Sequence, residues 1–462
     1  MESTPILTLY KRFLTNRRYI LPVSAALVFA FAFSFVHIVQ GVDDLCRSVY
    51  TEDYFYISFS GRTAGYLVMC LLGPEGHETR LQVIWGVLGL ALGAVTTCVL
   101  FAREDGENRI PLIFYTVFSC LLITAPINVS IWIYADTGFM VKWNYLWIPL
   151  ALLLLPGSRN DRFFPLRAAG AILLLGFAVS CFEIAAAVTA GLTGAMLLLY
   201  AQNARIHGIS ERNILRGILR RGLCIAFALL IGILLWKQIG SLFVESTGKQ
   251  ATQASHWLDH DASIRTILDM IRRQLIIWYG VGAFFHLSIA VNLISWGIAI
   301  ILLCICLVRG KYASALPLIL LILSPVALLI ARGDTIGYRT DQGLALFAAF
   351  LPSCLLILFR EKRGLFRSTA IVLSLLAVAQ CFYTNRLFHM EYEYRQELDE
   401  RLISSYKEVL NRYGEGTTAV FDILSANNDS PVRRFYTDCS DPIYNFFMAG
   451  FLSCMTRFPI RR

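Results

Sequence analysis

The sequence Gly41-Val42-Asp43-Asp44-Leu45-Cys46-Arg47-Ser48 follows directly on the first long apolar run of the chain, Tyr19–Val39. That run is about twenty residues long, enough for one helix to cross the hydrocarbon core of a bilayer. Two adjacent carboxylates where such a helix leaves the membrane are costly unless they face water or take part in chemistry. Asp43 and Asp44 are therefore candidate catalytic residues, and a solvated acidic loop explains them equally well. In a helix, Arg47 would share a face with both.

The composition indicates a membrane protein. Of the 462 residues 56% are hydrophobic and 16% are charged, and the mean hydropathy is +0.60. A soluble domain of this size could not bury so much apolar surface, so the surrounding solvent is the bilayer. The net charge of +9 does not indicate nucleic-acid binding, because the basic residues fall in short clusters between apolar runs.

These basic clusters predict the orientation of eleven membrane spans. Lys11, Arg12, Arg17 and Arg18 precede the first run, and five arginines lie between Arg205 and Arg221. Because cytoplasmic loops are enriched in Lys and Arg, both segments are predicted to be cytoplasmic. The first run is then an uncleaved signal anchor. The predicted outer segments are 40–80, 135–144, the turn at Glu183, 240–279, 332–341 and everything after 383.

The last eighty or so residues have a different composition. Met390–Tyr413 is charged with helical spacing, Thr417–Ile423 has the pattern of a strand, and Asn427–Pro431 is a turn sequence. The predicted fold is an all-α polytopic membrane domain over 1–383, in which the first outer loop, 40–80, is catalytic. A small α/β extracytoplasmic domain over 384–462 follows it.

The predicted outer segments hold the residues that transfer of a sugar from a polyprenyl phosphate would need. A carboxylate takes the proton of the acceptor hydroxyl. Arginines hold the lipid phosphate, because their planar fork matches two of its oxygens. Arg62, Arg332 and Arg339 are candidates for this role alongside Arg47. Glu183 is an isolated carboxylate in an apolar stretch and is a candidate substrate-binding residue. A hydrogen-bonded turn residue is its structural alternative.

No metal site or cofactor is predicted, and a metal requirement stays open. Most of the twelve cysteines lie inside apolar runs, where they act as small hydrophobic residues. His256 and His260 have spacing that could face a metal, but zinc needs a third protein ligand. An interfacial helix explains that stretch without a metal. Cys439 and Cys454 could form a disulfide outside the cytoplasm, and two free thiols fit the sequence as well.

The acidic pair, the following Arg47-Ser48 and the downstream Gly61-Arg62 resemble the first outer loop of GT-C glycosyltransferases. They are most similar to the Gtr serotype-converting glucosyltransferases of bacteria and phages. The resemblance implies that Asp43 or Asp44 is the catalytic carboxylate. It implies a polyprenyl-phosphate sugar donor, undecaprenyl-phosphate glucose, and a lipid-linked O-antigen acceptor. Transfer would occur with inversion on the periplasmic side of the bacterial inner membrane.

Three other functions stay open on the sequence. Another GT-C transferase would modify lipid A or a protein with a different sugar. An O-antigen polymerase would place its arginines in two large outer loops, and the early acidic pair argues against that. A flippase or transporter for lipid-linked sugars predicts charges at mid-membrane and internal repeats. Glu183 is the one such charge in the sequence, and no repeat is found.

Overall fold

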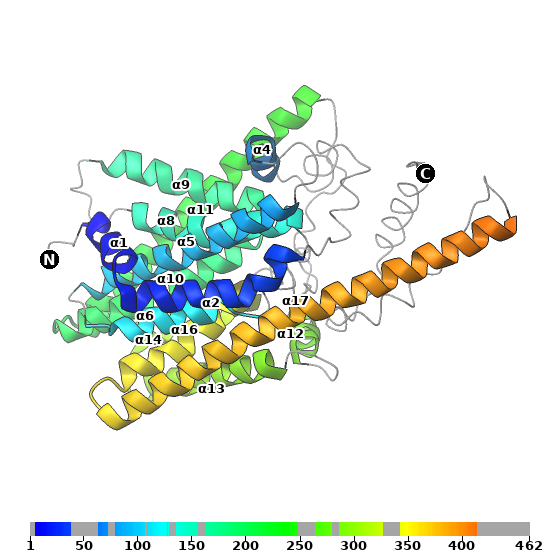
Figure 1. Ribbon diagram of the computed structural model, residues 1–462. Coiled ribbons are helices and arrows are strands. Elements are labelled where there is room, and N and C mark those ends of the chain that lie inside the picture. The colour runs from blue at the N-terminus through cyan, green and yellow to red at the C-terminus, as the bar shows by residue number, and fades with distance from the viewer. Residues whose placement is uncertain are drawn as a thin grey trace.

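The computed structural model describes residues 5–37, 63–72, 79–106, 109–126, 128, 135–155, 163–247, 264–279, 286–326 and 342–413. Within these ranges every regular element is a helix, and most of them form one bundle (Figure 1). In the described part of the chain, seven helices are long and apolar enough to cross a membrane, and four shorter apolar helices accompany them. Together they correspond to the eleven predicted apolar runs. The prediction of an all-α polytopic membrane fold is confirmed.

The helices follow one another along the chain with these bounds: α1 Ile6–Leu14, α2 Arg17–Val36, α4 Thr63–Leu72, α5 Thr79–Asp105, α6 Leu112–Ile123, α8 Ala135–Leu154, α9 Phe164–Cys181, α10 Ala185–Ile206, α11 Glu211–Thr247, α12 Ile264–Tyr279, α13 His286–Val308, α14 Tyr312–Leu323, the 3-10 helix η2 Ser324–Val326, α16 Gln342–Leu358 and α17 Arg363–Tyr413.

The short helix α1 is amphipathic and lies against the start of the bundle. Leu9 and Phe13 are buried, whereas Leu7 on the other side is 84% exposed. The Tyr10 hydroxyl donates to Thr96 Oγ1 of α5 at 2.9 Å. Burial raises the pKa of Tyr10, so its hydroxyl stays neutral and keeps this hydrogen bond. Such a helix suits the membrane interface beside the first span.

Several helices approach closely because glycines remove side chains from their contact. A Cβ on Gly176 of α9 would clash with the Gly232 carbonyl oxygen of α11. Likewise, a Cβ on Gly194 of α10 would lie 2.8 Å from the Pro317 carbonyl oxygen of α14. Small residues at such crossings allow the close van der Waals packing that drives helix association in membranes. A larger side chain at Gly176 or Gly194 would push the helices apart.

The predicted outer loop 135–144 is wrong, because α8 already begins at Ala135. The predicted loop carries the charged residues Asp136 and Lys142. The helix instead continues through them and packs against α5, α9 and α10. Lys142 is fully buried. Packing against these helices accounts for a helix where two charged residues suggested a loop.

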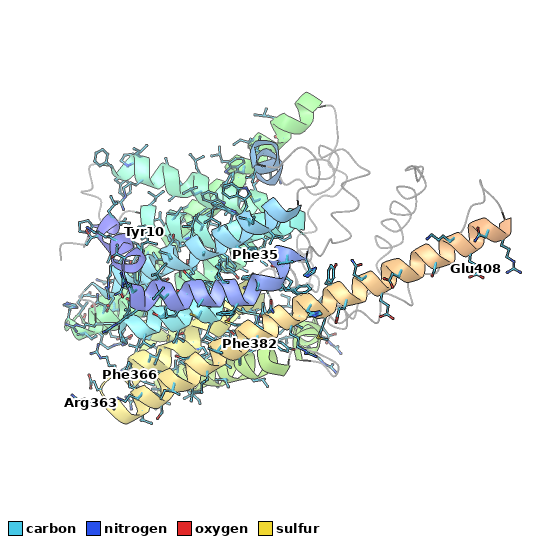
Figure 2. All side chains as sticks on the ribbon, in the orientation of Figure 1. Tyr10, Phe35, Arg363, Phe366, Phe382 and Glu408 are labelled. Atoms are coloured by element: carbon cyan, nitrogen blue, oxygen red, sulfur yellow. The ribbon has the colours of Figure 1, made fainter. Side chains whose placement is uncertain are left out.

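The last helix, α17, is 51 residues long. It includes the helix predicted for Met390–Tyr413, and it continues without a break across the predicted domain boundary at 383/384. Arg363 and Phe366 lie at one end of the bundle, and the orange half of α17 leads away from it toward Glu408 (Figures 1 and 2). The predicted strand Thr417–Ile423 and turn Asn427–Pro431 lie outside the described residues.

Candidate functional site

The bundle has two chemically different ends, which we call the basic end and the loop end. At the basic end, contacts between helices gather Arg103, Arg109, Arg167, Arg205, Arg221 and Arg360. At the loop end lie the described residues that flank the predicted site segments, namely Val36, Thr63, Val326 and Gln342. The predicted cytoplasmic clusters thus come together in space at one end.

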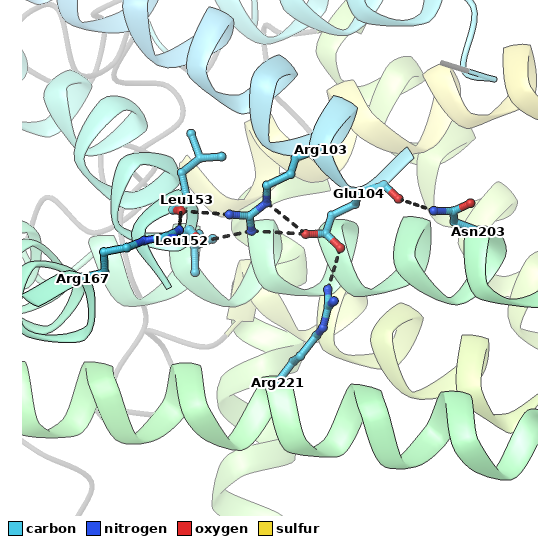
Figure 3. Close-up of polar contacts among 7 residues, drawn as sticks. All are labelled: Arg103, Glu104, Leu152, Leu153, Arg167, Asn203 and Arg221. Carbon is cyan, nitrogen blue, oxygen red and sulfur yellow. Dashed lines mark hydrogen bonds and ion pairs between the residues drawn. The ribbon is translucent and has the colours of Figure 1, made fainter. Parts of the chain in front are cut away.

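At the basic end, Glu104 on α5 is the centre of a buried ionic network (Figure 3). Its side chain is 6% exposed, and Oε2 accepts from Arg221 Nη1 of α11 at 2.6 Å. Oε1 accepts from Arg103 Nε and Nη2 at 3.3 and 3.2 Å. The Glu104 carbonyl accepts from Asn203 Nδ2 of α10 at 2.9 Å. Glu104 therefore joins α5 to α11 through its carboxylate and to α10 through its backbone carbonyl.

Arginines around this network also donate hydrogen bonds to the backbone carbonyls at the end of α8. Arg103 Nη1 donates to the Leu153 carbonyl at 2.9 Å, and Arg167 Nε of α9 donates to the Leu154 carbonyl at 3.1 Å. The last carbonyls of a helix have no partner within the helix, so these bonds cap it. The Arg221 guanidinium also lies 4.0 Å from the centre of the Tyr200 ring. With its groups committed in this way, the network is a structural clamp.

In the sequence Glu104 belongs to Arg103–Arg109, a charged stretch that is predicted to form a cytoplasmic turn after the second span. The structure buries it because α5 continues to Asp105, whose Oδ2 then accepts from the Ile110 backbone N–H at 2.9 Å. The charged stretch Arg103–Arg109 has the composition of a turn when only its neighbours in sequence are considered. The partner that makes burial of Glu104 tolerable, Arg221, is 117 positions away. No local signal could have found this pair.

At the loop end, the principal predicted site residues fall in segments that the structure does not describe. Asp43, Asp44, Arg47 and Arg62 lie between α2 and α4, and Arg332 and Arg339 lie between η2 and α16. Their side chains are therefore not placed, and their roles stay predictions. The described residues on each side of these segments can be placed.

The segment that carries Asp43 and Asp44 begins beside α17. The Phe33 backbone N–H donates to Asn385 Oδ1 at 3.0 Å. The Phe33 ring stacks on His37 with centroids 4.5 Å apart and on His389 with centroids 4.8 Å apart. Tyr392 meets the Phe33 ring edge-on at 5.5 Å. Four aromatic rings thus fix the end of α2 to α17.

The same segment ends beside α9 and α11. The Ala64 backbone N–H, in the first turn of α4, donates to Ser180 Oγ at 3.1 Å. A Cβ on Gly240 of α11 would lie 2.7 Å from Thr63 Oγ1. The chain therefore leaves the described bundle next to α17 and re-enters it next to α9 and α11.

Glu183 lies in the turn between α9 and α10, where it was predicted. Its side chain is half-buried, and its carbonyl accepts from the Ala186 N–H at 3.1 Å. Ser180, which binds the start of α4, is one turn earlier on α9. Glu183 is thus near the point where the predicted catalytic segment re-enters the bundle, and its role in binding substrate stays a prediction.

Buried polar groups connect α6 to α17 near the loop end. Thr124 Oγ1 donates to Gln380 Oε1 at 3.1 Å, and Thr384 Oγ1 donates to the Thr124 carbonyl at 2.8 Å. Beside them is a small pocket lined by Leu121, Ala125, Pro126, Asn292, Leu344, Ala345, Ala348 and Gln380. The pocket adjoins the start of α16, where the segment carrying Arg332 and Arg339 returns.

The structure adds Lys142 and Asn144, both on α8, to the polar residues near the loop end. Both side chains are fully buried. Neither polar atom of the Asn144 amide has a hydrogen-bond partner among the described residues. Sequence reasoning missed them because it read 135–144 as a loop. A signal was present: apolar residues flank Lys142 on both sides, at Phe139–Val141 and Tyr145–Ile148.

Among the described residues, no group of three or more His, Cys, Asp or Glu side chains could hold a metal ion. His256 and His260 lie outside those residues, as do Cys439 and Cys454.

No protein-family model and no curated protein sequence matches the chain. Two solved structures of the oligosaccharyltransferase of Archaeoglobus fulgidus are similar to it, the apo form and a form tethered to an acceptor peptide containing the NVT sequon. Their TM-scores are 0.39 and 0.35, each at 11% identity over 81% of this chain. The chain covers 56% of that enzyme's length. A likeness this weak does not by itself identify a fold family or an activity.

Proposed function

We propose that the chain is a membrane glycosyltransferase of the GT-C type. It would transfer a sugar from a polyprenyl-phosphate donor to a lipid-linked glycan acceptor. The observation that most supports this proposal concerns two internal segments whose flanking helix ends lie at the same end of the bundle. The segment with Asp43 and Asp44 and the segment with Arg332 and Arg339 both leave and re-enter the described bundle at the loop end. A base and phosphate-binding cations would then belong to one region.

In the proposed reaction one carboxylate, from Asp43 or Asp44, acts as the general base. The acceptor hydroxyl oxygen attacks the anomeric carbon and gives its proton to this carboxylate. The bond from the anomeric carbon to the phosphate oxygen breaks, and the lipid phosphate leaves with the bonding electrons. A single displacement of this kind inverts the anomeric centre. The second carboxylate would order the segment or pair with Arg47.

The arginines would bind the leaving phosphate. Arg332 and Arg339 are the proposed phosphate ligands, supported by Arg62, since a guanidinium can donate two parallel hydrogen bonds to phosphate. Glu183, near the returning end of the catalytic segment, would accept a hydrogen bond from a sugar hydroxyl. The apolar helix surfaces around the loop end would hold the polyprenyl tail beside membrane lipids.

The basic end is the proposed cytoplasmic side, because it gathers the arginines of several helices. The N-terminus would then be cytoplasmic, and the site and the C-terminus would face the periplasm of a bacterial inner membrane. The finer assignment is glucose as the sugar and an O-antigen unit as the acceptor, so that the enzyme modifies lipopolysaccharide and converts serotype. This part rests on the resemblance of the first outer loop alone.

One observation favours a second candidate function, a flippase or transporter for lipid-linked sugars. That function predicts charges inside the membrane, and Lys142 is a buried lysine at the start of the apolar segment Val141–Leu154 of α8. The transferase fits it as well, since a phosphate must be bound in both cases.

Purified full-length protein in liposomes separates the two candidates. Radiolabelled undecaprenyl-phosphate glucose and lipid-linked O-antigen are supplied, and label is measured in the acceptor and in each leaflet. The expected result is label in the acceptor. Movement of labelled donor between leaflets with no label in any lipid-linked acceptor would refute the transferase.

A further inference from the structure

A small pocket inside the bundle has two amide side chains in its wall. It is formed where α6, α13, α16 and α17 pack against one another. Asn292 of α13 and Gln380 of α17 both line it, and these residues are only 7% and 3% exposed. The other described residues of the wall are apolar. Because a buried amide is costly without a hydrogen-bond partner, this wall suits a pocket that a polar group enters.

The pocket lies toward the loop end. Pro126 follows the end of α6, Leu344 is in the first turn of α16, and Asn292 is in the second turn of α13. The opposite ends of α6 and α16 meet at the basic end, where Arg360 Nη1 donates to the Arg109 carbonyl at 3.2 Å. The first turn of α16 comes directly after the segment that carries the proposed phosphate ligands, so the pocket adjoins the proposed site.

The wall of this pocket fits a neutral hydroxyl better than an ion. One polar atom of the Gln380 amide is 3.1 Å from Thr124 Oγ1, and the amide has a second polar atom. Amides both donate and accept hydrogen bonds, as a hydroxyl does. No charged side chain is among the described lining residues, so an ion would have no countercharge there.

The size of the pocket limits what can enter it. Three of its lining residues are alanines, Ala125, Ala345 and Ala348, whose small side chains leave the space open. The cavity volume is ≈ 10 Å³, which is room for the centre of about one water-sized group. A hydroxyl of a larger ligand therefore fits, whereas a whole sugar ring does not.

We propose that Asn292 and Gln380 bind one hydroxyl of the donor sugar and thereby select the sugar. This inference rests on the proposed function and names specificity-determining residues of its site. Because the donor sugar is bonded directly to the lipid phosphate, a phosphate bound by the segment before α16 would hold the sugar beside this pocket. A site that hydrogen-bonds a substrate hydroxyl rejects analogues that lack it, since its buried polar groups are then left unpaired.

Equilibrium binding to the purified full-length chain in detergent tests the proposal without requiring transfer. Undecaprenyl-phosphate glucose and undecaprenyl phosphate are titrated separately, and the ratio of their Kd values measures the contribution of the sugar. Wild type is expected to bind the glucose lipid more tightly. Asn292→Leu and Gln380→Met remove the polar atoms at similar volume. Each is expected to reduce the ratio about three- to tenfold and to leave binding of undecaprenyl phosphate unchanged.

Asn203→Leu is the matched control, because Asn203 donates to the Glu104 carbonyl at the basic end. It is expected to lower stability and to keep the wild-type ratio. Wild type that binds the two lipids equally would overturn the inference. Amide variants that keep the wild-type ratio would also overturn it, and the pocket would then hold a structural water only.

If the amide variants do not fold, Ala348→Val fills the pocket and removes no polar group. The same loss of the ratio is expected, and a folded Ala348→Val protein with the wild-type ratio would overturn the inference. Transfer from donors that each lack one sugar hydroxyl separates the two proposals. Wild type with the expected ratio that transfers no sugar would refute the transferase alone. Equal discrimination among these donors by wild type and Asn292→Leu would refute the role of the amides alone.

Discussion

At the basic end of the bundle charged side chains bind one another, whereas near the loop end the printed contacts between buried side chains are hydrogen bonds between neutral groups. Glu104 has Arg103 and Arg221 within hydrogen-bond distance. Near the loop end, neither polar atom of the buried Asn144 amide has a hydrogen-bond partner among the described residues. The first arrangement stabilises a fold, and the second costs stability. Charged residues at the two ends should therefore respond differently to mutation.

The largest expected contrast is the side of the membrane on which each end lies. A reporter that is active only outside the cytoplasm is expected to be active when fused after Tyr413. The same reporter fused after Arg212 is expected to be silent, because that position belongs to the most arginine-rich segment of the chain. Reporter activity is measured in intact cells. A silent Tyr413 fusion would move the far end of α17, and with it the proposed site, to the cytoplasm.

Removing the proposed base should abolish transfer and leave the fold intact. For Asp43→Asn and Asp44→Asn, at least one variant is expected to lose transfer by about a hundred- to ten-thousand-fold, the usual contribution of general base catalysis. Both should reach the membrane at wild-type amounts, which immunoblotting measures. Asp269→Asn is the control, since Asp269 is an exposed carboxylate on α12. Full transfer by both aspartate variants would exclude this segment as the catalytic one.

Mutation of the Glu104 clamp should lower the stability of the fold and leave sugar transfer unchanged. Glu104→Gln removes the carboxylate that Arg103 and Arg221 share. Because the Arg221 side chain is 36% exposed and water can solvate it, the expected loss of unfolding free energy is about 1–3 kcal/mol, less than for a fully buried pair. Transfer per folded molecule should stay the same. Denaturant unfolding measures the first quantity, and the transfer assay measures the second.

The control for the clamp is Glu361→Gln. Glu361 is 85% exposed and 3.7 Å from Arg360, so its loss should hardly change stability. If Glu104→Gln reduced transfer per folded molecule as strongly as an aspartate variant, the clamp would belong to the active site and the contrast between the ends would fail.

The sequence alone predicts those features of the fold that neighbouring residues determine, and it misses those that contacts between distant residues determine. The eleven apolar runs were found because a membrane span needs a long apolar stretch, which any window of the chain reveals. Lys142 was misplaced because its helical state is fixed by contacts with α5, α9 and α10. The length of α17 was missed because its composition changes after Tyr383 while its backbone does not. Asp43, Asp44, Arg332 and Arg339 lie outside the described residues, so the site rests on their chemistry and on the ends of the helices around them.

A smaller effect is expected from the proposed phosphate ligands. Arg339→Lys and Arg332→Lys lose the planar fork, and a charge-assisted hydrogen bond is worth about 1.5–3 kcal/mol. The apparent KM for donor should rise about ten- to a hundred-fold. Arg272→Lys is the control, because Arg272 is exposed on α12, where only a positive charge at the interface is needed. Unchanged donor KM in both variants would remove these arginines from the phosphate site.

The smallest expected effect concerns the attachment of the catalytic segment to α17. Asn385→Leu removes the acceptor of the Phe33 N–H, a part-buried hydrogen bond of 3.0 Å, and should cost about 1 kcal/mol of stability. Because Phe33 is near the end of α2, a small shift there is transmitted to the segment that carries Asp43 and Asp44. Transfer per folded molecule should therefore fall several-fold, since catalysis is sensitive to small displacements of reacting groups. Asn385→Asp keeps an acceptor oxygen and should behave like wild type. Equal transfer by Asn385→Leu and Asn385→Asp would mean that the end of α2 does not position the catalytic segment.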